Sequence, residues 1–315
     1  MTATGHNEAP SGAQVQAQAG GGEGATALAA FWAAHRPEVF AGAANWTALS
    51  GGRTNAVWRV QTPAGALVVK LYRADAATPL FANDPEAEAA SLAALAGTGL
   101  APDLVATALT PQGPSLVYSH IAGRPWQAAD NPSLVAEALA RLHARALPDG
   151  LPMRPPGADR LRAEALAMLD DLGPQGAALA ALRPGALPDP GDAPPAFIHG
   201  DATAANALVT GAGLTFIDWQ CPGGGDAADD LAVFLSPAMQ AVSGNAPLTA
   251  AGEAAFLASY QAAGADHART VARYHARAPL YHWRMAAYAT WRAARGDDAY
   301  AAAAALETAR LKAAK

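Results

Sequence analysis

The stretch "IHGDATAANALVTGAGLTFIDW", residues 198–219, predicts a short hairpin with polar residues around its open end. Two strand-like runs, "ALVT" and "LTFI", are joined by "GAG", which is a signal for a tight turn. If the hairpin turns at Ala212, Asn206 and Asp218 are equidistant from the turn and lie side by side. An amide oxygen beside a carboxylate suits Mg²⁺, a hard cation that takes oxygen ligands. The sequence therefore predicts a metal-binding pair at the open end of the hairpin.

Asp201 lies in the loop before this hairpin, five residues ahead of Asn206. At that spacing its carboxylate can face the same site without being a metal ligand itself. A carboxylate within hydrogen-bond reach of a hydroxyl can accept its proton. The stretch thus combines a candidate metal pair with a candidate proton acceptor.

The composition indicates a globular, helix-leaning protein. Of its 315 residues, 51% are hydrophobic and 15% are charged, and alanine supplies much of the hydrophobic share. This length fits one large domain or two lobes that share a cleft, and we expect two lobes. The net charge of −6 argues against nucleic acid as the main partner, because phosphate backbones are bound by clustered Lys and Arg.

Cysteine usage and hydropathy predict the compartment. The single cysteine, Cys221, excludes an internal disulfide framework and a multi-thiolate metal site. The first residues lack the basic start and apolar core of a signal peptide, and no run of about 18 uncharged apolar residues predicts a membrane span. We therefore expect a cytoplasmic protein without a membrane span.

The chain falls into three parts by its pattern. Residues 1–24 mix Gly, Ala, Gln and Ser without aliphatic periodicity, which predicts a flexible tail. Residues 25–121 hold a helix, five strand-like runs separated by Gly and Pro turns, and a second helix that opens at Asp84. Residues 122–315 are dominated by helical patterns around the hairpin. We predict an α+β fold, with a five-stranded antiparallel sheet and a helix in the first lobe and a mainly helical second lobe.

Three motifs follow in order from residue 199: "HGDATAANAL", "FIDW" and "GGGDAADDLA". They resemble the patterns H-G-D-x-x-x-x-N, I-D-[WF] and G-D-P-x-x-D-L-A of the aminoglycoside phosphotransferase and choline kinase superfamily, which are protein-kinase-like small-molecule kinases. The resemblance implies a two-lobed protein-kinase-like fold. It also implies an ATP- and Mg²⁺-dependent enzyme that moves the γ-phosphate to a hydroxyl of a small molecule.

The resemblance assigns roles to residues within these motifs. Asp201 is then the catalytic base, and Asn206 and Asp218 hold Mg²⁺. His199 is a structural residue of the loop. Asp230, which matches the last Asp of the third motif, braces the site from behind.

Phosphoryl transfer also needs a cation on the phosphates, and the strand-like run "LVVKLYR" supplies Lys70. Its apolar neighbours place the ammonium group against a core, where it needs a partner. The helix that follows this strand in the family puts that partner at Glu88, with Glu86 as the alternative. The turn "GGRTN" would cover the phosphates, and "SLVYSHI" resembles the hinge that contacts adenine. The nucleotide-binding residues expected in this way are Lys70, Glu88, Gly51, Gly52, Thr54, Asn55, Ser119 and Ile121.

The acceptor is expected to be an amino alcohol, because "GGRTN" and "IDW" look more like choline, ethanolamine and thiamine kinases than like the antibiotic kinases. Trp219, Trp283 and Trp291 could then form a cage for a quaternary or aromatic cation, with core packing as the alternative. An aminoglycoside is the alternative acceptor. A protein kinase is not favoured, since no long activation segment follows Asp218. An inactive nucleotide-binding module would have lost Asp201, Asn206 or Asp218, yet all three are present.

Overall fold

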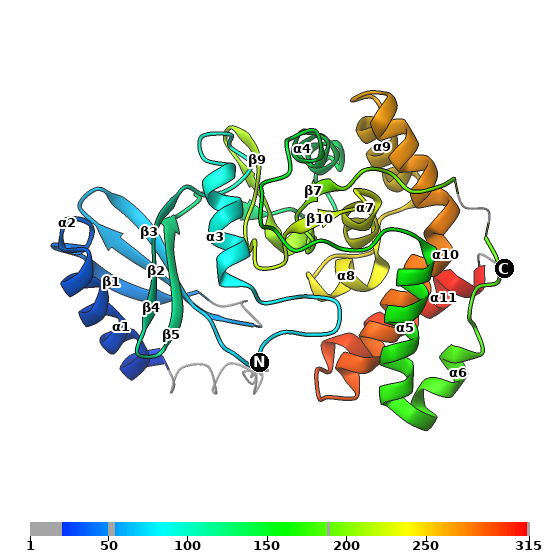
Figure 1. Cartoon of the computed structure of the whole chain (residues 1–315), viewed down its shortest axis with the longest axis horizontal. Helices are drawn as coiled ribbons and strands as arrows, with labels where there is room; N and C mark the ends of the chain where they lie inside the picture. Colours follow the sequence, from blue (N-terminus) through cyan, green and yellow to red (C-terminus); the bar gives the residue numbers. More distant parts are fainter. Residues whose placement is uncertain (1–20, 50–53, 188–189, 314–315) are drawn as a thin grey trace, which may run out of the picture. The chain divides into compact units, whose positions relative to one another are not determined.

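The computed structural model describes residues 21–49, 54–187 and 190–313 (Figure 1). By its internal contacts the chain divides into two compact units. The first comprises the chain up to Ala76 together with Val105–His120, and the second comprises Ala77–Leu104 together with Ile121–Lys315. Among the residues described, no helix is both long and apolar enough to cross a membrane.

A five-stranded antiparallel sheet forms the first unit, as predicted. Strand β3 is central in it, and Lys70 on β3 stands opposite Val57 and Leu116 on its two neighbours. The β-branched and aromatic residues of these strands favour extended backbone, and alternate residues of β2 from Trp58 to Thr62 are buried. The strands are β1 (Ala44–Ala48), β2 (Ala56–Thr62), β3 (Gly65–Leu71), β4 (Leu104–Thr110) and β5 (Gly113–Ser119), in the order β1-β2-β3-β5-β4.

Helices α1 (Gly21–His35) and α2 (Pro37–Phe40) pack against this sheet (Figure 1). The shared core consists of Leu28, Trp32, Phe40, Trp58, Val60, Val69, Ala106 and Val117. Because α1 begins at Gly21, the end of the predicted tail, residues 1–24, is helical. Residues 1–20 of that tail lie outside the described residues.

The segment Ala77–Leu104 belongs to the second unit, whereas residues 25–121 were predicted to form one lobe. The segment carries α3 (Pro85–Ala94), which Asp84 caps by accepting hydrogen bonds from two backbone N–H groups. Its two ends are tied to the predicted hairpin region. Asp84 N donates to Gln220 O over 3.1 Å, and Phe216 N donates to Leu100 O over 2.9 Å. These long-range backbone bonds explain why the segment groups with the second unit.

The rest of the second unit is mainly helical, as predicted. The long helix α10 packs against both α5 and α11. The helices are α4 (Ser133–His143), α5 (Ala158–Leu172), α6 (Ala177–Ala180), α7 (Ala228–Leu235), α8 (Pro237–Val242), α9 (Ala250–Gln261), α10 (Ala265–Ala293) and α11 (Ala299–Ala313), with short 3₁₀ turns at Gly173–Gly176 and Ala204–Asn206.

Two small sheets lie among these helices. One has the order β6-β8-β9 and contains the predicted hairpin, and the other pairs β10 with β7 in antiparallel fashion. The strands are β6 (Arg124–Pro125), β7 (Ala196–Ile198), β8 (Ala207–Thr210), β9 (Gly213–Phe216) and β10 (Gly223–Gly225). Residues 199–206, which connect β7 to β8, are called the HGD loop below.

Candidate active site

The hairpin forms as predicted, but its register differs by one residue from the predicted one. Ala207 stands opposite Phe216 and Thr210 opposite Gly213, so the turn consists of two residues, Gly211 and Ala212. Two-residue turns are the commonest connections in hairpins. Asn206 is therefore opposite Ile217, whose backbone N–H donates to Asn206 O over 2.9 Å, and not opposite Asp218.

Asp218 follows directly in a left-handed backbone conformation. Its φ is +61°, and the only other non-glycine residue with positive φ in the described part of the chain is Asn45. Such conformations are uncommon for residues with a Cβ, and Asp and Asn adopt them more readily than most. They cost about 1–3 kcal/mol and concentrate at functional sites. Asp218 thus differs from its neighbours in having a strained, left-handed backbone, as residues at functional sites often do.

The side-chain amide nitrogen of Asn206 forms its hydrogen bonds with Asp201. Nδ2 donates to the backbone oxygen of Asp201 over 2.9 Å and to its Oδ2 over 3.0 Å. Among the described residues, no donor contacts Asn206 Oδ1. The amide oxygen is therefore available as a ligand for a hard cation.

Asp201 has the features of a proton acceptor. Its Oδ1 is buried and has no hydrogen-bond partner in the part of the chain that the structure describes. A buried acceptor without a donor costs about 1–3 kcal/mol, so such atoms are rare in native proteins and call for an explanation. Burial raises the pKa of Asp201 well above its usual range, and the negative charge of Asp218 acts in the same direction. Asp201 thus keeps one oxygen for a group that comes from outside the chain.

Asp230 holds the HGD loop through its backbone. Its carboxylate accepts hydrogen bonds from His199 N and Gly200 N, each over 2.8 Å. His143 Nε2 lies 3.0 Å from the same carboxylate. Burial alone would raise the pKa of Asp230, but the hydrogen bond and charge of His143 outweigh it, and the pKa is lowered. A buried carboxylate with several donors stays ionised and fixes the backbone in front of Asp201.

His199 links the HGD loop to the end of the hairpin. Its ring is fully buried, with Nε2 3.1 Å from Ile217 O and Nδ1 3.2 Å from Asp201 N. A tautomer with the proton on Nε2 satisfies both contacts. His143 is also part of this framework through Asp230 and through Tyr260, whose hydroxyl lies 2.7 Å from Nδ1.

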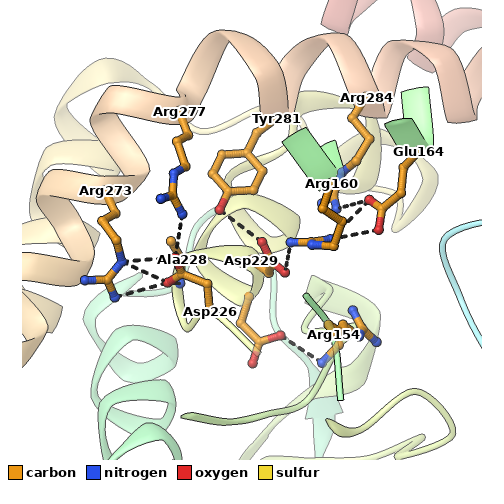
Figure 2. Close-up of polar contacts among 12 residues, drawn as sticks. Arg154, Arg160, Glu164, Asp226, Ala228, Asp229, Arg273, Arg277, Tyr281 and Arg284 are labelled. Carbon is orange, nitrogen blue, oxygen red and sulfur yellow. Dashed lines mark hydrogen bonds and ion pairs between the residues drawn. The ribbon is translucent and has the colours of Figure 1, made fainter. Parts of the chain in front are cut away.

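The acidic residues before Asp230 anchor α7, a role that the sequence did not indicate (Figure 2). Asp226 accepts from Arg273 Nε over 3.0 Å and from Arg277 Nη1 over 2.8 Å, and it also accepts from Ala228 N at the start of the helix. All three charged side chains are buried. The spacing of the two arginines, four residues apart on α10, is the one local signal for this cluster.

Asp229 makes the equivalent anchor to α5. It accepts from Arg160 Nη2 over 2.5 Å and from the Tyr281 hydroxyl over 3.0 Å. Glu164 then joins Arg160 to Arg284 of α10 (Figure 2). Removing one partner of such a buried pair leaves an uncompensated charge and costs about 3–5 kcal/mol. These pairs hold the start of α7, and with it Asp230, against two long helices.

The expected nucleotide-binding residues of the first unit lie on or beside its sheet. Lys70 is 1% exposed, and its Nζ lies 4.9 Å from the centre of the Tyr72 ring. Asn55 is buried, and its Oδ1 accepts from Arg73 N over 3.0 Å. Thr54 is half-buried and Ser119 ends β5. Gly51 and Gly52 lie outside the described residues.

The other two expected residues, Ile121 and Glu88, belong to the second unit. Glu88 on α3 is 1% exposed, whereas Glu86 is exposed. A buried carboxylate requires compensation and an exposed one does not. Burial therefore favours Glu88 over Glu86, while its pairing with Lys70 remains a prediction.

The expected aromatic cage is not formed by the three tryptophans. Trp219 and Trp283 have no exposed surface, and their indole N–H groups donate to Phe216 O over 3.0 Å and to Leu179 O over 2.8 Å. They are core residues, because no ligand can reach a fully buried ring. Trp291 is half-buried and donates to Asp171, and the Arg295 guanidinium already lies 3.8 Å from its ring centre.

The chain is similar to known proteins in sequence pattern and in fold. The model of the phosphotransferase enzyme family matches residues 45–270, whereas no curated protein matches. Among solved structures, a choline/ethanolamine kinase family protein from Mesorhizobium loti is 20% identical with a TM-score of 0.60, and covers 92% of this chain and 94% of its own. The choline kinase of Cryptosporidium parvum is 15% identical with a TM-score of 0.56, and covers 85% and 88%. A thermostable mutant of aminoglycoside phosphotransferase APH(4)-Ia, in ternary complex with AMP-PNP and hygromycin B, is 14% identical with a TM-score of 0.58, and covers 91% and 98%.

At these identities the likeness to solved structures shows the fold. The family model, in contrast, runs from the first sheet through the HGD loop, the hairpin and α7. These are the elements that carry Asp201, Asn206, Asp218 and Asp230. This chain therefore belongs to the phosphotransferase enzyme family, the small-molecule kinases that its three motifs resemble.

Proposed function

We propose that this kinase transfers the γ-phosphate of ATP to a hydroxyl of a small molecule, with Asp201 as the catalytic base. The observation that carries the proposal is the buried Oδ1 of Asp201, which has no hydrogen-bond partner among the described residues. The other oxygen, Oδ2, is held by Asn206. Asp201 can therefore orient a substrate hydroxyl and take its proton as the oxygen attacks the γ-phosphate.

Asn206 and Asp218 would hold Mg²⁺. The donor set fits this ion, because Asn206 keeps its amide oxygen unengaged and Asp218 adds a carboxylate. Mg²⁺ commonly binds through one or two protein oxygens together with substrate phosphates and water. When bound, it would neutralise charge on the phosphates. His199 and Asp230 keep the loop in place, so that little reorganisation is needed during the reaction.

Lys70 would bind the phosphates from the first unit, with Glu88 as its partner. A Lys on a central strand is the usual cation of kinase-like sites. Lys70 is buried, and its positive charge acts more strongly in the protein interior than it would in water. The AMP-PNP complex of APH(4)-Ia supports ATP as the phosphate donor. Thr54, Asn55, Ser119 and Ile121 remain the expected residues around the nucleotide, with Gly51 and Gly52.

The acceptor is proposed to be an amino alcohol of the choline, ethanolamine or thiamine type, with an aminoglycoside as the alternative. The motifs "GGRTN" and "IDW" support the first class. The hygromycin B complex of APH(4)-Ia supports the second. The burial of Trp219 and Trp283 means that any cation site would have to be built from other side chains.

A panel assay tests this function. ADP release is measured with choline, ethanolamine, thiamine, homoserine, sugars and aminoglycosides, each with Mg²⁺ and again after EDTA. We expect one class to raise ADP release above the acceptor-free rate, and EDTA to abolish the increase. An increase that survives EDTA in full would contradict the metal site, and a panel without any acceptor-dependent release would contradict the acceptor classes proposed.

A further inference from the structure

We propose that Arg154 is a positioning residue for phosphoryl transfer, which fastens the HGD loop to the chain that follows Asp218. The inference rests on the proposed function, because it assigns Arg154 to the reaction of Asp201. Arg154 lies in the connection between α4 and α5, outside the three motifs. Its contacts, its surroundings and its charge lead to the same role.

The backbone of Arg154 is fixed to the sheet that leads into the HGD loop. Arg154 N donates to Gly224 O over 2.8 Å, and Gly224 N donates to Pro152 O over 2.9 Å. Gly224 belongs to β10, which pairs with β7. Strand β7 ends at Ile198, directly before the HGD loop. The side chain of Arg154 therefore begins at a point that is hydrogen-bonded, through two strands, to the start of this loop.

The guanidinium group of Arg154 lies where the two segments of the site meet. Its Nη2 donates to Cys221 O over 2.7 Å. A Cβ added at Gly200 would lie 2.4 Å from the same Nη2 and 2.0 Å from Cys221 O. Gly200 thus touches both groups, and its φ of +79° also favours glycine. Since Gly200 precedes Asp201 and Cys221 follows Asp218 by three residues, Arg154 joins the base to the metal side of the site.

The run Gly223–Gly225 makes room for this arrangement. A Cβ at Gly223 would lie 2.5 Å from Pro152 O, and one at Gly224 would lie 2.5 Å from the Met153 sulfur. Distances below about 3 Å do not occur for real Cβ atoms, and the Pro152 carbonyl belongs to the backbone, so this segment can lie this close only against a glycine at position 223. At position 224 the Met153 side chain could move away instead. Gly223 therefore serves the close approach that brings Arg154 to the HGD loop.

The charge of Arg154 is used differently from that of the other arginines nearby. Arg160, Arg273, Arg277 and Arg284 are each paired with a carboxylate in the network around α7 (Figure 2). Arg154 pairs with no carboxylate within the described residues and donates to a carbonyl instead. Its positive charge acts electrostatically on the Asp201 carboxylate without a hydrogen bond to it. A structural ion pair would not leave this charge available to the site.

Loss of the guanidinium would remove the hydrogen bond that fixes the Cys221 carbonyl beside Gly200. The HGD loop would then keep its bonds to Asp230, but its distance from the Asp218 segment would be less strictly set. A displacement of about 1 Å between reacting groups can cost about 100-fold in rate. Nucleotide binding through the first unit would be unaffected, so the effect belongs in kcat and not in KM.

The test compares Arg154→Met and Arg154→Lys with the wild type. We expect Arg154→Met to lower kcat about 100-fold, with the KM for ATP, the affinity for Mg·ADP and the thermal midpoint unchanged. Arg154→Lys restores the charge without the planar fork, so an intermediate kcat is expected. Arg145→Met is the matched control, because Arg145 lies exposed in the same connection and makes its hydrogen bond, to Leu142 O, through the backbone, with none from its side chain among the described residues. Its kcat should equal that of the wild type.

Each outcome separates this inference from the proposed function. Equal kcat for the wild type and Arg154→Met, or a loss of kcat that follows a loss of Mg·ADP affinity and of thermal stability, overturns the positioning role alone. If Arg154→Met does not fold, Arg154→Gln is measured in its place. It keeps a donor for the Cys221 carbonyl but loses the charge and reach of the guanidinium, so a kcat between that of the wild type and the loss of about 100-fold is expected, and a kcat equal to that of the wild type overturns the positioning role. A wild-type protein without Mg²⁺-dependent phosphoryl transfer, measured as ADP release with the acceptor panel or with water as acceptor, overturns the proposed function itself and the positioning role with it.

Discussion

At the scale of single residues, the site is defined by which side-chain atoms form hydrogen bonds within the described chain and which do not. Asn206 gives both amide protons to Asp201 and keeps its oxygen, and Asp201 gives Oδ2 to Asn206 and keeps Oδ1. The motif predicted that Asp201 and Asn206 both belong to the site. It could not predict which atom each residue keeps available, because that depends on the 3₁₀ turn Ala204–Asn206 and on the left-handed backbone of Asp218.

The proposed role of Asp218 as a Mg²⁺ ligand is tested by substitution. We expect Asp218→Ala to bind ADP no better with Mg²⁺ than without it, because a hard cation loses its carboxylate ligand. Calorimetric titration with ADP at several Mg²⁺ concentrations measures this dependence. Asp218→Asn, which keeps one oxygen ligand, should retain part of it. A Mg²⁺ dependence equal to that of the wild type in Asp218→Ala would show that the ion is held elsewhere.

At the scale of elements, the hairpin was predicted and its register was not. The sequence "GAG" allows a turn centred on Ala212, but a two-residue turn places Asn206 opposite Ile217. The local sequence pattern also did not predict the ion pairs at the start of α7. Asp226 meets arginines that are 47 and 51 positions away, and Asp229 meets one that is 69 positions away. No local periodicity encodes such partners, since they meet only after α5 and α10 have packed.

The anchoring of α7 is tested with Asp226→Asn. The substitution leaves the buried guanidinium group of Arg273 without its carboxylate and removes one of the two carboxylates that pair with Arg277, since Asp192 remains. We expect the free energy of unfolding to fall by about 3–5 kcal/mol in chemical denaturation. Asp266→Asn is the control, because Asp266 pairs with Arg269 at the surface and such pairs often contribute nothing measurable. Equal stability of the two variants would mean that the buried pairs do not hold α7.

At the scale of the whole molecule, the sequence predicted a sheet-containing part and a helical part, and both are present. It placed the segment Ala77–Leu104 with the sheet because the segment lies between strands in the chain. Its backbone bonds run instead to residues 216–220, far along the sequence. The resemblance to the family depended on the order of three motifs along the sequence. That order does not depend on which segments contact one another in the folded chain, and the family model matches residues 45–270. The proposed catalytic and metal-binding residues Asp201, Asn206 and Asp218 all belong to the second unit, and Lys70 belongs to the first.

The expected pair of Lys70 and Glu88 joins residues of the two units, and a double-mutant cycle tests it. We expect Lys70→Met and Glu88→Gln each to raise the KM for ATP, and the double variant to raise it by less than the product of the two effects. Coupling of about 0.5–3 kcal/mol is typical of residues in contact. Glu86→Gln, at the exposed neighbour on α3, should be additive with Lys70→Met. Additive effects of Lys70→Met and Glu88→Gln would contradict the pairing.

Asp201 is proposed to take the proton of the substrate hydroxyl, and Asp201→Asn tests this role. The substitution keeps the size of the side chain and removes the base, which contributes about 100- to 10,000-fold in general base catalysis. The measurement is acceptor-dependent ADP release, with the affinity for Mg·ADP determined on the same preparation. We expect turnover to fall by about this factor while Mg·ADP binds as tightly as in the wild type. Undiminished turnover in Asp201→Asn would contradict it.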